Sequence, residues 1–537
     1  MKKYIYFSTL LTCLLAVFGC ENDFDAKIYG SLSTTNFPAS EADYESYMMD
    51  CYIPFSVNWT YSWGGATQHN FYVAEGGIYR MLDTATDLCA PWMLGGSWGG
   101  PFIYMPQGQF KDMEYASRAS TVLPSHFEKI RDITRMTEII GTLEESTVLS
   151  DTKKRELIGE ARLLRGMTMY YLFHFYGPIP VILDPGLVGD TEAEKKLERP
   201  TLDEMTEYIT ADFEFAAENM VEIQTEKGRY TADYARFCLM RHYLNEGAHT
   251  EGYYKKAYDL YTQFTGNYSL FMSGENPYLD QFKIANEFNC ETIMAVSCSE
   301  TADGSGKRGN FNPFSWYLLP FDAAKYDDKG NPTPFALQGG GWGQCYNIDS
   351  RYYDTFEEND LRKEGILTSY YSDWYGWVTR DHIGVRWDGF ILNKYPIETA
   401  TAFQGTDYPL ARWADVLLMY AEADVRLNNT VSSSAIDCVN QVRHRAGLGD
   451  LATEKTASID AFMDALLEER GHELYYEGGR RVDLIRFNKY YTIMSEYNCT
   501  PTSQYFPIPN FAVDQAAAEG YTLTQYFTRD DYDGPKI

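Results

Sequence analysis

The sequence predicts a mainly α-helical protein, in which about four pairs of helices form a scaffold interrupted by long irregular loops. Two observations support this fold class. Apolar residues recur every three or four positions in several long stretches, as they do on one face of a helix. The segments between them are rich in glycine, proline, asparagine and aromatic residues and show no helical period. Small residues such as Ala414, Ala421 and Ala435 would let paired helices pack closely, so we expect tetratricopeptide-like hairpins.

The N-terminus has the features of a secretory signal. Lys2 and Lys3 precede an apolar run that ends at Phe18, and this run is too short for a transmembrane helix. Residues 1–19 are therefore predicted to be a signal peptide, and the sequence before Cys20 resembles a bacterial lipobox with Cys20 as the lipidated residue. Residues 20–39 would form a lipid-anchored tether, and we expect this lipid to be the only membrane anchor.

Residues 40–537 are predicted to fold as one domain, because each helix pair of a repeat scaffold needs its neighbours to cover its apolar face. The helical scaffold is expected at about 40–55, 123–265 and 407–487, with loop-rich binding regions at about 56–122 and 266–406. Short β-like runs are expected at 291–298 and 389–395. The individual helices predicted are 40–53, 123–149, 151–175, 202–221, 231–245, 251–265, 410–428 and 434–447.

Tryptophans gather in the two loop-rich regions. Trp92 and Trp98 stand among glycines in the first region, and the second contains the ring-dense patches GGGWGQCY and SYYSDWYGW. Indole and phenol rings can lie flat on the C–H faces of sugars, whose hydroxyl groups then need amide, carboxylate or guanidinium partners. The alternative is that these loops pack their rings on the scaffold. The candidate ligand-binding residues are Trp92, Trp98, Trp316, Trp342, Trp374, Trp377, Asn347, Asp373 and Arg380.

A charged segment near the C-terminus, 462–487, leaves two interpretations open. Glu469, Glu473 and Glu477 are spaced one helical turn apart and are expected to face several arginines that follow them in the chain. This line of carboxylates could be an acid/base or phosphate site, or a structural network of ion pairs that clamps a helix end. We favour the network, because arginine prefers bidentate pairing with carboxylates and no nucleophile, metal motif or phosphate loop accompanies it.

The composition excludes some functions. Of 537 residues, 45% are hydrophobic and 23% are charged, and 76 Asp and Glu against 46 Lys and Arg give a net charge of −30. Such a charge repels nucleic acid and anionic membranes, and it disfavours polyanionic ligands unless basic groups gather locally. The 44 Tyr and 10 Trp exceed what a helical core needs, so many rings are expected on surfaces where they can contact a ligand.

No catalytic residue, metal site or cofactor is predicted. Ten cysteines include Cys13 in the signal and the lipidated Cys20, and the remaining eight contain no CxxC pair, so we expect isolated thiols, with Cys290 and Cys298 as the pair to test. His174 has no second histidine at ligand spacing, which indicates a packing role. The run 327–331 lacks the later glutamate of a calcium loop and is predicted to be a turn.

Several motifs together resemble one protein family. The run EARLLRGMTMYYLFHFYGPIPV precedes RWADVLLMYAEA, NQVRHRAGL, EERGHELYYEGGRRVDLIRF and YFPIP, which follow one another in the C-terminal part. Their order and spacing resemble the signatures of the SusD/RagB family of nutrient-binding outer-membrane lipoproteins. The resemblance implies a helical, tetratricopeptide-scaffolded protein on the surface of a Bacteroidota-like Gram-negative cell. It also singles out Trp98, since members of the family place ligand-contacting rings in such N-terminal loops.

The resemblance implies a function as well. The protein would be a non-catalytic lipoprotein that captures oligosaccharides and delivers them to a SusC-like TonB-dependent outer-membrane transporter, without a cofactor or nucleic acid. A peptide-capturing role within the same family is the alternative, and the ring-rich loops favour sugar over peptide. A glycoside hydrolase would need two carboxylates ~5 to 9 Å apart across a cleft, and no motif supports one. A structural or adhesive role would be distinguished by the absence of small-ligand binding.

Overall fold

The computed structural model divides into two compact units, Met1–Tyr47 and Met48–Ile537. In the first unit, helix α2 (Glu41–Met48) begins after Ser40, whose hydroxyl accepts a hydrogen bond from the Asp43 backbone at 3.3 Å. The second unit holds nearly all the other elements. The residues that the structure describes are 37–56, 70–73, 77–90, 108, 126–196, 198–299, 312, 319–341, 347–380, 389–400, 404–501, 503–526 and 528–530.

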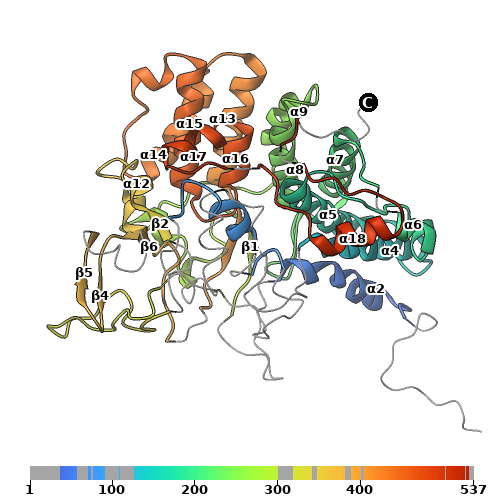
Figure 1. Ribbon diagram of the computed structural model, residues 1–537, viewed down its shortest axis with the longest axis horizontal. Coiled ribbons are helices and arrows are strands. Elements are labelled where there is room, and N and C mark those ends of the chain that lie inside the picture. Colours follow the sequence, from blue (N-terminus) through green and yellow to red (C-terminus); the bar gives the residue numbers. More distant parts are fainter. Residues whose placement is uncertain are drawn as a thin grey trace, which may run out of the picture. The chain divides into compact units, whose positions relative to one another are not determined.

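The second unit is mainly α-helical, which confirms the predicted fold class (Figure 1). Its longer helices are α4 (Ile130–Glu145), α5 (Asp151–Tyr176), α7 (Leu202–Asn219), α8 (Ala232–Glu246), α9 (Tyr253–Leu260), α13 (Trp413–Asn428), α14 (Ser433–Arg445) and α15 (Ile459–Leu474). Shorter helices are α6 (Thr191–Lys195), α10 (Pro277–Asp280), α12 (Ser350–Tyr353), α16 (Arg480–Arg486), α17 (Tyr490–Glu496) and α18 (Asn510–Ala518). The helix predicted over 251–265 is too long, because α9 ends at Leu260.

Local sequence explains where these helices begin and end. The hydroxyl of Ser150 accepts a hydrogen bond from the Lys153 backbone at the start of α5. Thr201 and Glu204 form a reciprocal capping box at the start of α7. Helix α5 ends at Gly177, whose φ of 74° favours glycine over any other residue.

Consecutive helices pack side by side, as expected of helical hairpins. Helix α5 packs on α4 and on α7, α7 packs on α8, and α8 packs on α9. The C-terminal helices join this row, because α13 packs on α9 as well as on α14 and α15. Stacked rings fill the junction of α9 and α13: the centroids of Tyr261 and Tyr420 are 4.1 Å apart, and those of Tyr261 and Trp413 are 5.7 Å apart. The two groups of helices therefore share a packed interface.

A buried cluster forms the core of the C-terminal helices. Ala414, Ala421 and Ala435 are 0% exposed, so the small residues lie where α13 and α14 approach each other, as predicted. Close approach brings larger side chains of α13, α14 and α15 together around them. These larger side chains include Leu417, Leu418, Val439, Val442, Phe462 and Leu466.

The first helix of this group begins later than predicted. Tyr408–Arg412 form strand β7, which pairs antiparallel with β1 (Thr292–Val296), so Leu410 lies in a strand and not on the helical stripe. The spacing of Leu410 from the following apolar residues fits a helix, but pairing with β1 satisfies the backbone groups of this stretch instead. Pro409 contributes no backbone N–H and lowers the helical propensity there.

Short strands form three small sheets among the described residues. Strand β1 pairs with β7, and the runs predicted at 291–298 and 389–395 are confirmed as β1 and β6. The second sheet has the order β2-β6-β3, and β4 pairs with β5 in a hairpin. The bounds of these strands are β2 (Asn347–Asp349), β3 (Ile366–Leu367), β4 (Tyr370–Ser372), β5 (Gly376–Val378) and β6 (Gly389–Leu392).

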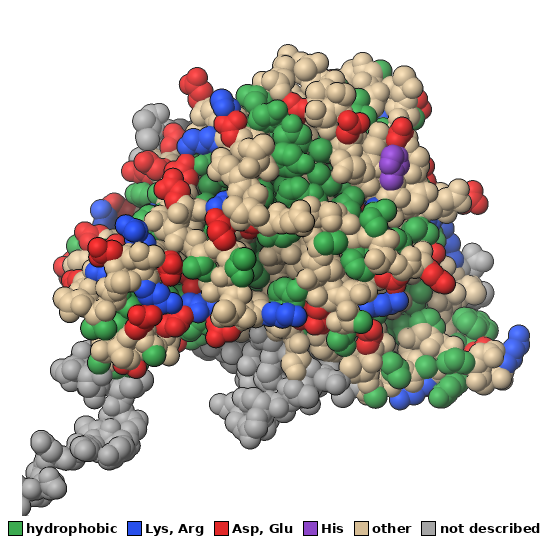
Figure 2. Space-filling model, turned by 180° about the vertical axis from the view of Figure 1, so that it is seen from behind, with side chains coloured by type: hydrophobic (Ala, Val, Ile, Leu, Met, Phe, Trp, Pro, Cys, Tyr) green, Lys and Arg blue, Asp and Glu red, His purple; other side chains and the backbone are tan. Residues whose placement is uncertain are grey.

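Acidic and basic side chains are mixed over the face of the molecule drawn in Figure 2, which shows no continuous basic area on the part drawn in colour. Nucleic acid would find no basic track on that face. Within the stretches that the structure describes, no helix combines the length and the apolar character needed to cross a membrane.

Candidate functional site

The β4–β5 hairpin presents the densest group of exposed rings in the described part of the chain. Tyr370 and Val378 lie opposite each other and are buried, whereas Tyr371 lies opposite Trp377 on the other face of the hairpin. The turn between the strands carries Asp373, Trp374 and Tyr375 and closes at Gly376, whose φ is 70°. The positive φ favours glycine there and so lets the chain reverse within four residues of Ser372.

Buried polar contacts hold the turn in place. The Ser372 hydroxyl donates to the Asp322 carboxylate at 2.6 Å and accepts from the backbone N–H of Trp374 at 3.0 Å and of Tyr375 at 3.2 Å. Asp322 is 2% exposed and also accepts from the Tyr370 hydroxyl at 3.2 Å. Because Ser372 fixes the backbone of Trp374 and Tyr375, the rings of these two residues are pre-organised for contact.

Three adjacent rings on this hairpin are more than half exposed: Trp374 at 58%, Tyr375 at 56% and Trp377 at 53%. Phe321 supports Trp374 in an edge-on contact, with their centroids 4.9 Å apart at an interplanar angle of 63°. Tyr371 supports Trp377 in the same way at 5.6 Å and 79°. Five of the seven exposed aromatic side chains in the described residues belong to this region; the seven are Phe321, Tyr326, Trp374, Tyr375, Trp377, Tyr491 and Phe511.

Polar groups stand beside these rings. Asp373 is exposed at the turn, and Arg380 follows β5. Arg380 makes a bidentate ion pair with Asp354, one contact of which is 2.8 Å, and its hydrogen bonds lower the pKa of Asp354. The guanidinium group of Arg380 also lies over the Phe390 ring, 5.2 Å from its centroid. Exposed rings flanked by a carboxylate and a guanidinium group match the chemistry of a sugar, which has apolar C–H faces and hydroxyl edges.

The structure brings together four of the predicted ligand-binding residues, since Asp373, Trp374, Trp377 and Arg380 all lie in or directly after this hairpin. Asn347 was predicted to contact a ligand, but the structure places it in the interior. It lies in β2, is 1% exposed, and its side-chain oxygen accepts a hydrogen bond from the Cys89 thiol, so it does not face a ligand surface. The other predicted positions lie outside the described residues; they are Trp92, Trp98, Trp316, Trp342 and the lipidation residue Cys20.

Sequence reasoning missed Phe321 and Asp322, which support the hairpin from a separate segment. No local pattern relates them to β4, because the contact joins residues about fifty positions apart in the chain. Tyr375 was detectable, because it stands between Trp374 and Trp377 in the predicted ring-dense patch.

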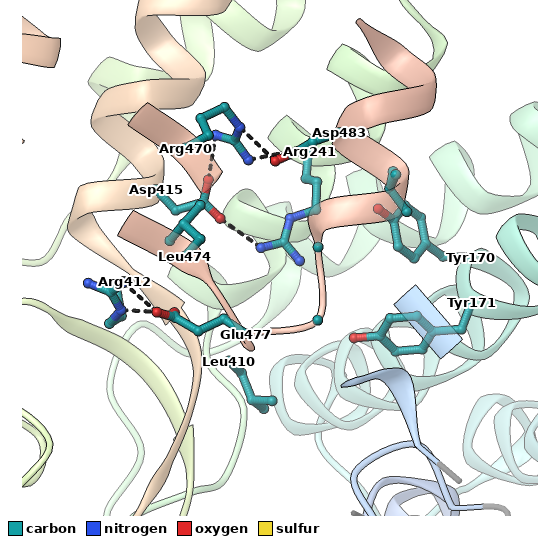
Figure 3. A pocket seen from close by; sticks show the side chains of 13 residues that line it. Tyr170, Tyr171, Arg241, Leu410, Arg412, Asp415, Arg470, Leu474, Glu477 and Asp483 are labelled. Atoms are coloured by element: carbon teal, nitrogen blue, oxygen red, sulfur yellow. Dashed lines mark hydrogen bonds and ion pairs between the residues drawn. The ribbon is translucent and has the colours of Figure 1, made fainter. Parts of the chain in front are cut away.

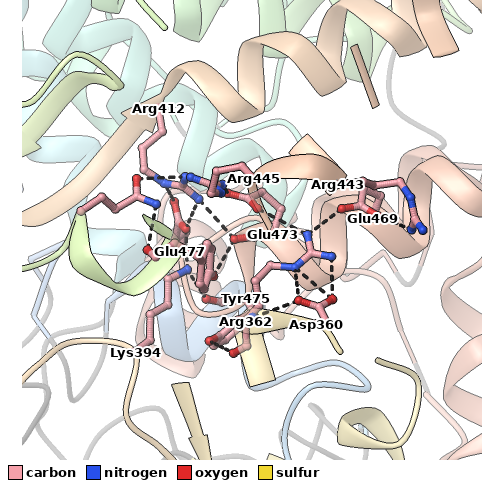
Figure 4. A network of polar contacts seen from close by, with 12 residues as sticks. Asp360, Arg362, Lys394, Arg412, Arg443, Arg445, Glu469, Glu473, Tyr475 and Glu477 are labelled. Atoms are coloured by element: carbon pink, nitrogen blue, oxygen red, sulfur yellow. Dashed lines mark hydrogen bonds and ion pairs between the residues drawn. The ribbon is translucent and has the colours of Figure 1, made fainter. Parts of the chain in front are cut away.

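The line of glutamates on and after α15 belongs to a structural network of ion pairs, which confirms the interpretation favoured from the sequence (Figure 4). Glu469, Glu473 and Glu477 are all buried or nearly so, and every one binds at least two cationic groups. Their cationic partners are Arg362, Lys394, Arg412, Arg443 and Arg445.

The prediction that these glutamates face the arginines that follow them in the chain is wrong. The arginines that follow them in the chain pair elsewhere: Arg480 binds Asp87 at 2.7 Å, and Arg486 binds Glu422 at 2.9 Å and Asp483 at 2.6 Å. The glutamates instead face cations from helix α14 and from strands and loops earlier in the chain, because the tertiary packing of α15 turns them inward.

Glu473, which binds three of the arginines in this network, stays ionised at neutral pH. Burial alone would raise the pKa of Glu473, but Arg445 and Arg412 outweigh it and lower that pKa to about 2. The Glu473 carboxylate is 0% exposed, so a substrate has no access to it. The acid/base alternative therefore finds no support in the geometry.

The pKa of a second buried acid predicts a loss of stability at low pH. Burial would raise the pKa of Asp483, but Arg470 and Arg486 lower it to about 2 from its ordinary value of 3.8. The folded state thus holds this carboxylate charged more firmly than the unfolded chain does, so its contribution is complete above the unfolded pKa and is lost as the pH falls toward 2. We expect the difference in unfolding free energy between wild type and Asp483→Asn to shrink by about 2 kcal/mol between pH 5 and pH 2, measured by urea unfolding. A difference that stays constant with pH would contradict the assignment.

A small internal cavity lies where α5, α8, α13 and the α15–α16 region meet (Figure 3). Tyr170 and Tyr171 line one side, and Arg241 donates to Asp415 at 2.8 Å on the other. Its volume of about 20 Å³ is that of a water site and is too small for a sugar. This cavity is therefore not a candidate ligand site.

The remaining candidates from the sequence have structural roles. His174 contacts the Asn245 side chain at 3.3 Å, and burial lowers its pKa to about 3. The run 327–331 is a turn, as predicted, in which the Asp327 backbone N–H donates to the Asn331 carbonyl at 2.9 Å. Among the described residues there is no cluster of side chains suited to a metal ion, and the cysteines found there, including Cys290 and Cys298, are free thiols.

Two family models match this chain. One, described as the SusD family, matches residues 300–527, and the other, described as starch-binding and associating with the outer membrane, matches residues 107–244. A SusD-like protein of Formosa agariphila is 22% identical over 518 residues, which cover 90% of this chain and 89% of the relative. The starch-binding protein SusD of Bacteroides thetaiotaomicron is 32% identical over 108 residues, which cover 20% of this chain and 18% of the relative.

Solved structures share the fold. Surface glycan-binding protein A from Bacteroides fluxus aligns with a TM-score of 0.68 at 20% identity, over 91% of this chain and 99% of its own. Surface glycan-binding protein A from Bacteroides thetaiotaomicron, solved in complex with laminarihexaose, aligns with a TM-score of 0.68 at 18% identity, over 91% and 99% of the two chains. Similarity at 18 to 20% identity establishes a shared fold but does not identify the ligand.

Proposed function

Because this chain belongs to the SusD family, we propose that it is a surface glycan-binding protein that captures oligosaccharides on the β4–β5 hairpin. The observation that carries the proposal is the exposure of three adjacent rings, Trp374, Tyr375 and Trp377, on a turn held by buried polar contacts. The names of the relatives, which include surface glycan-binding proteins and a starch-binding protein, support a glycan as the ligand class.

The expected affinity is modest. Each indole would stack on one sugar ring, while Asp373 and Arg380 offer hydrogen bonds to hydroxyl groups. Stacking contacts of ~0.5 to 1.5 kcal/mol each and net hydrogen bonds of similar size, less the cost of association, give dissociation constants from roughly micromolar to millimolar. Trp92, Trp98, Trp316 and Trp342 remain predicted members of the same or an adjoining site.

We also propose that the protein is anchored to the outer membrane through Cys20 and delivers its ligand, uncleaved, to a SusC-like TonB-dependent transporter. The description of the second matching family supports the outer-membrane location, and the sequence before Cys20 supports the lipid. Asp354, which pairs with Arg380 beside the hairpin, has its pKa lowered by that arginine and so is poorly suited to act as a general acid.

The double substitution Trp374→Ala with Trp377→Ala tests the binding site. We expect it to weaken glycan binding about tenfold to a hundredfold, because two stacking contacts of ~0.5 to 1.5 kcal/mol are removed. Wild type and variant, both without residues 1–20, would be run through native gels that contain plant, host and microbial polysaccharides. The wild type should be retarded by at least one glycan, and the variant should migrate with little or no retardation in that gel.

Phe511→Ala is the matched control, because Phe511 is a 42% exposed aromatic residue on α18, outside the hairpin. It should be retarded as wild type is. Equal retardation of the double variant and wild type would remove both tryptophans from the site.

Failure of every glycan to retard wild type, together with binding of casein-derived peptides, would favour the peptide-capturing alternative. New reducing ends after incubation with the bound glycan would indicate hydrolysis and contradict a non-catalytic role.

A further inference from the structure

A surface groove lies among the N-terminal helices of the scaffold, away from the β4–β5 hairpin. Its volume is about 410 Å³, which falls in the range of sites that bind small ligands or short segments of chain. Helices α4, α6 and α18 contribute its walls, and the segment 180–182 contributes its floor. In Figure 1 these three helices stand together on the right, while β4 and β5 stand at the left edge.

The groove combines an apolar floor with a polar rim. Phe511 lines it and is 42% exposed, and Ile130, Val181 and Ile182 line it from two other segments. Arg131 stands on the rim with its side chain 78% exposed, and its ion pair with Glu128 is long, at 3.8 Å. Among the described residues the Arg131 guanidinium group makes no hydrogen bond, so its donors are available to a ligand.

The main chain along the floor has unpaired hydrogen-bonding groups. Pro178 and Pro180 keep residues 178–183 out of a helix, and this segment also has no strand partner in the described structure. Two carbonyl groups of this segment are paired: that of Ile182 accepts from the Thr137 hydroxyl at 2.8 Å, and that of Pro178 accepts from the Arg199 guanidinium group at 2.5 Å. Within the described residues, the N–H and C=O groups of Val181, which lines the groove, and of Leu183, which follows the floor directly in the chain, have no protein partner.

We propose that this groove binds an extended peptide segment of a partner protein. The peptide backbone would pair with Val181 and Leu183, because unpaired N–H and C=O groups along a chain are a template for another strand. An apolar side chain of the peptide would pack against Phe511 and Ile182, and an acidic side chain would bind Arg131. A purely apolar ligand would cover the floor but leave these main-chain groups and the guanidinium group without partners.

A random heptapeptide library displayed on phage, selected on the protein without residues 1–20, supplies the probe. The most frequent peptide would be synthesised with a fluorescein label and its binding measured by fluorescence anisotropy. We expect alternating apolar residues and at least one acidic residue in the selected sequences. Phe511→Ala and Arg131→Ala should each weaken binding by about tenfold, because both residues are anchors at the surface.

Val513→Ala is the matched control, because Val513 is on the same helix and 36% exposed but does not line the groove. It should bind the labelled peptide as wild type does. The proposal is overturned if no peptide is selected, or if the selected peptide binds Phe511→Ala and Arg131→Ala as tightly as wild type. It is also overturned if the Trp374→Ala, Trp377→Ala variant loses the peptide, because the hairpin would then hold it. Since the groove is separate from the hairpin, failure here leaves the glycan site untouched.

Discussion

Replacing Glu473 by alanine is expected to lower the free energy of unfolding by about 3 to 5 kcal/mol, the usual effect of removing one partner from a buried ion pair. The Glu473 carboxylate is 0% exposed, lies 2.9 Å from Arg412, is also bound by Arg445, and is 3.4 Å from Arg362. Its removal leaves three guanidinium groups in the interior with less negative charge beside them. The shift of the urea unfolding midpoint at pH 7 measures the effect.

Glu468→Ala is the matched control, because Glu468 is on the same helix and pairs with Lys455 at 2.8 Å at the surface. The side chains of this pair are 44% and 37% exposed, so we expect a change below about 1 kcal/mol. If Glu473→Ala were no more destabilising than Glu468→Ala, the network would not be a main source of stability.

Helical period locates the acidic residues of this network but does not identify their partners. The spacing of Glu469, Glu473 and Glu477 is a local property, and it correctly predicts one line of carboxylates. Two of their five cationic partners, Arg362 and Lys394, are 107 and 83 positions away from the acids they bind. Pairing over such distances depends on how loops and strands pack on α15, and one sequence contains no direct signal of that packing.

The same limit explains which parts of the candidate site were predictable. The ring-dense patch around Trp374 and Trp377 is visible in the sequence, and so is Gly376, which permits a tight turn. Asn347 looked equally suitable by residue type, yet pairing of β2 with β6 buries it. Burial of a polar residue in a short strand depends on its neighbours in the sheet, so composition alone could not separate Asn347 from Asp373.

Helices with side-chain caps and long apolar stripes were predictable, because both signals are local. Helix α5 begins and ends within one residue of its prediction, whereas Leu410 was assigned to a helix and lies in β7. The difference arises because β7 depends on pairing with β1, more than a hundred residues earlier in the chain. Tertiary pairing of this kind overrides local periodicity in short segments.

Asp87→Ala is expected to destabilise the protein by about 3 to 5 kcal/mol and to release the segment 77–90 from the C-terminal helices. Asp87 binds Arg480 through two hydrogen bonds of 3.0 and 2.7 Å, and their side chains are 4% and 7% exposed. Asp83 adds to this attachment by accepting from the backbone of Gly478 at 2.6 Å and of Arg480 at 3.0 Å. Hydrogen exchange followed by mass spectrometry should show that Asp87→Ala, compared with wild type, accelerates amide exchange in 77–90 more than in α13.

A double-mutant cycle with Arg480→Met decides whether the cost arises from a buried charge left without its partner. Asp87→Ala leaves the Arg480 guanidinium group buried, with the Leu467 carbonyl at 2.9 Å as its remaining acceptor. The double variant removes both charges, so we expect it to be less destabilised than the sum of the two single variants by about 1 to 3 kcal/mol. Additive effects would mean that the pair acts through packing and not through charge. Trp92 and Trp98 follow Asp87 closely in the sequence, so glycan binding by the Asp87→Ala variant would test whether these two predicted residues contribute to the site.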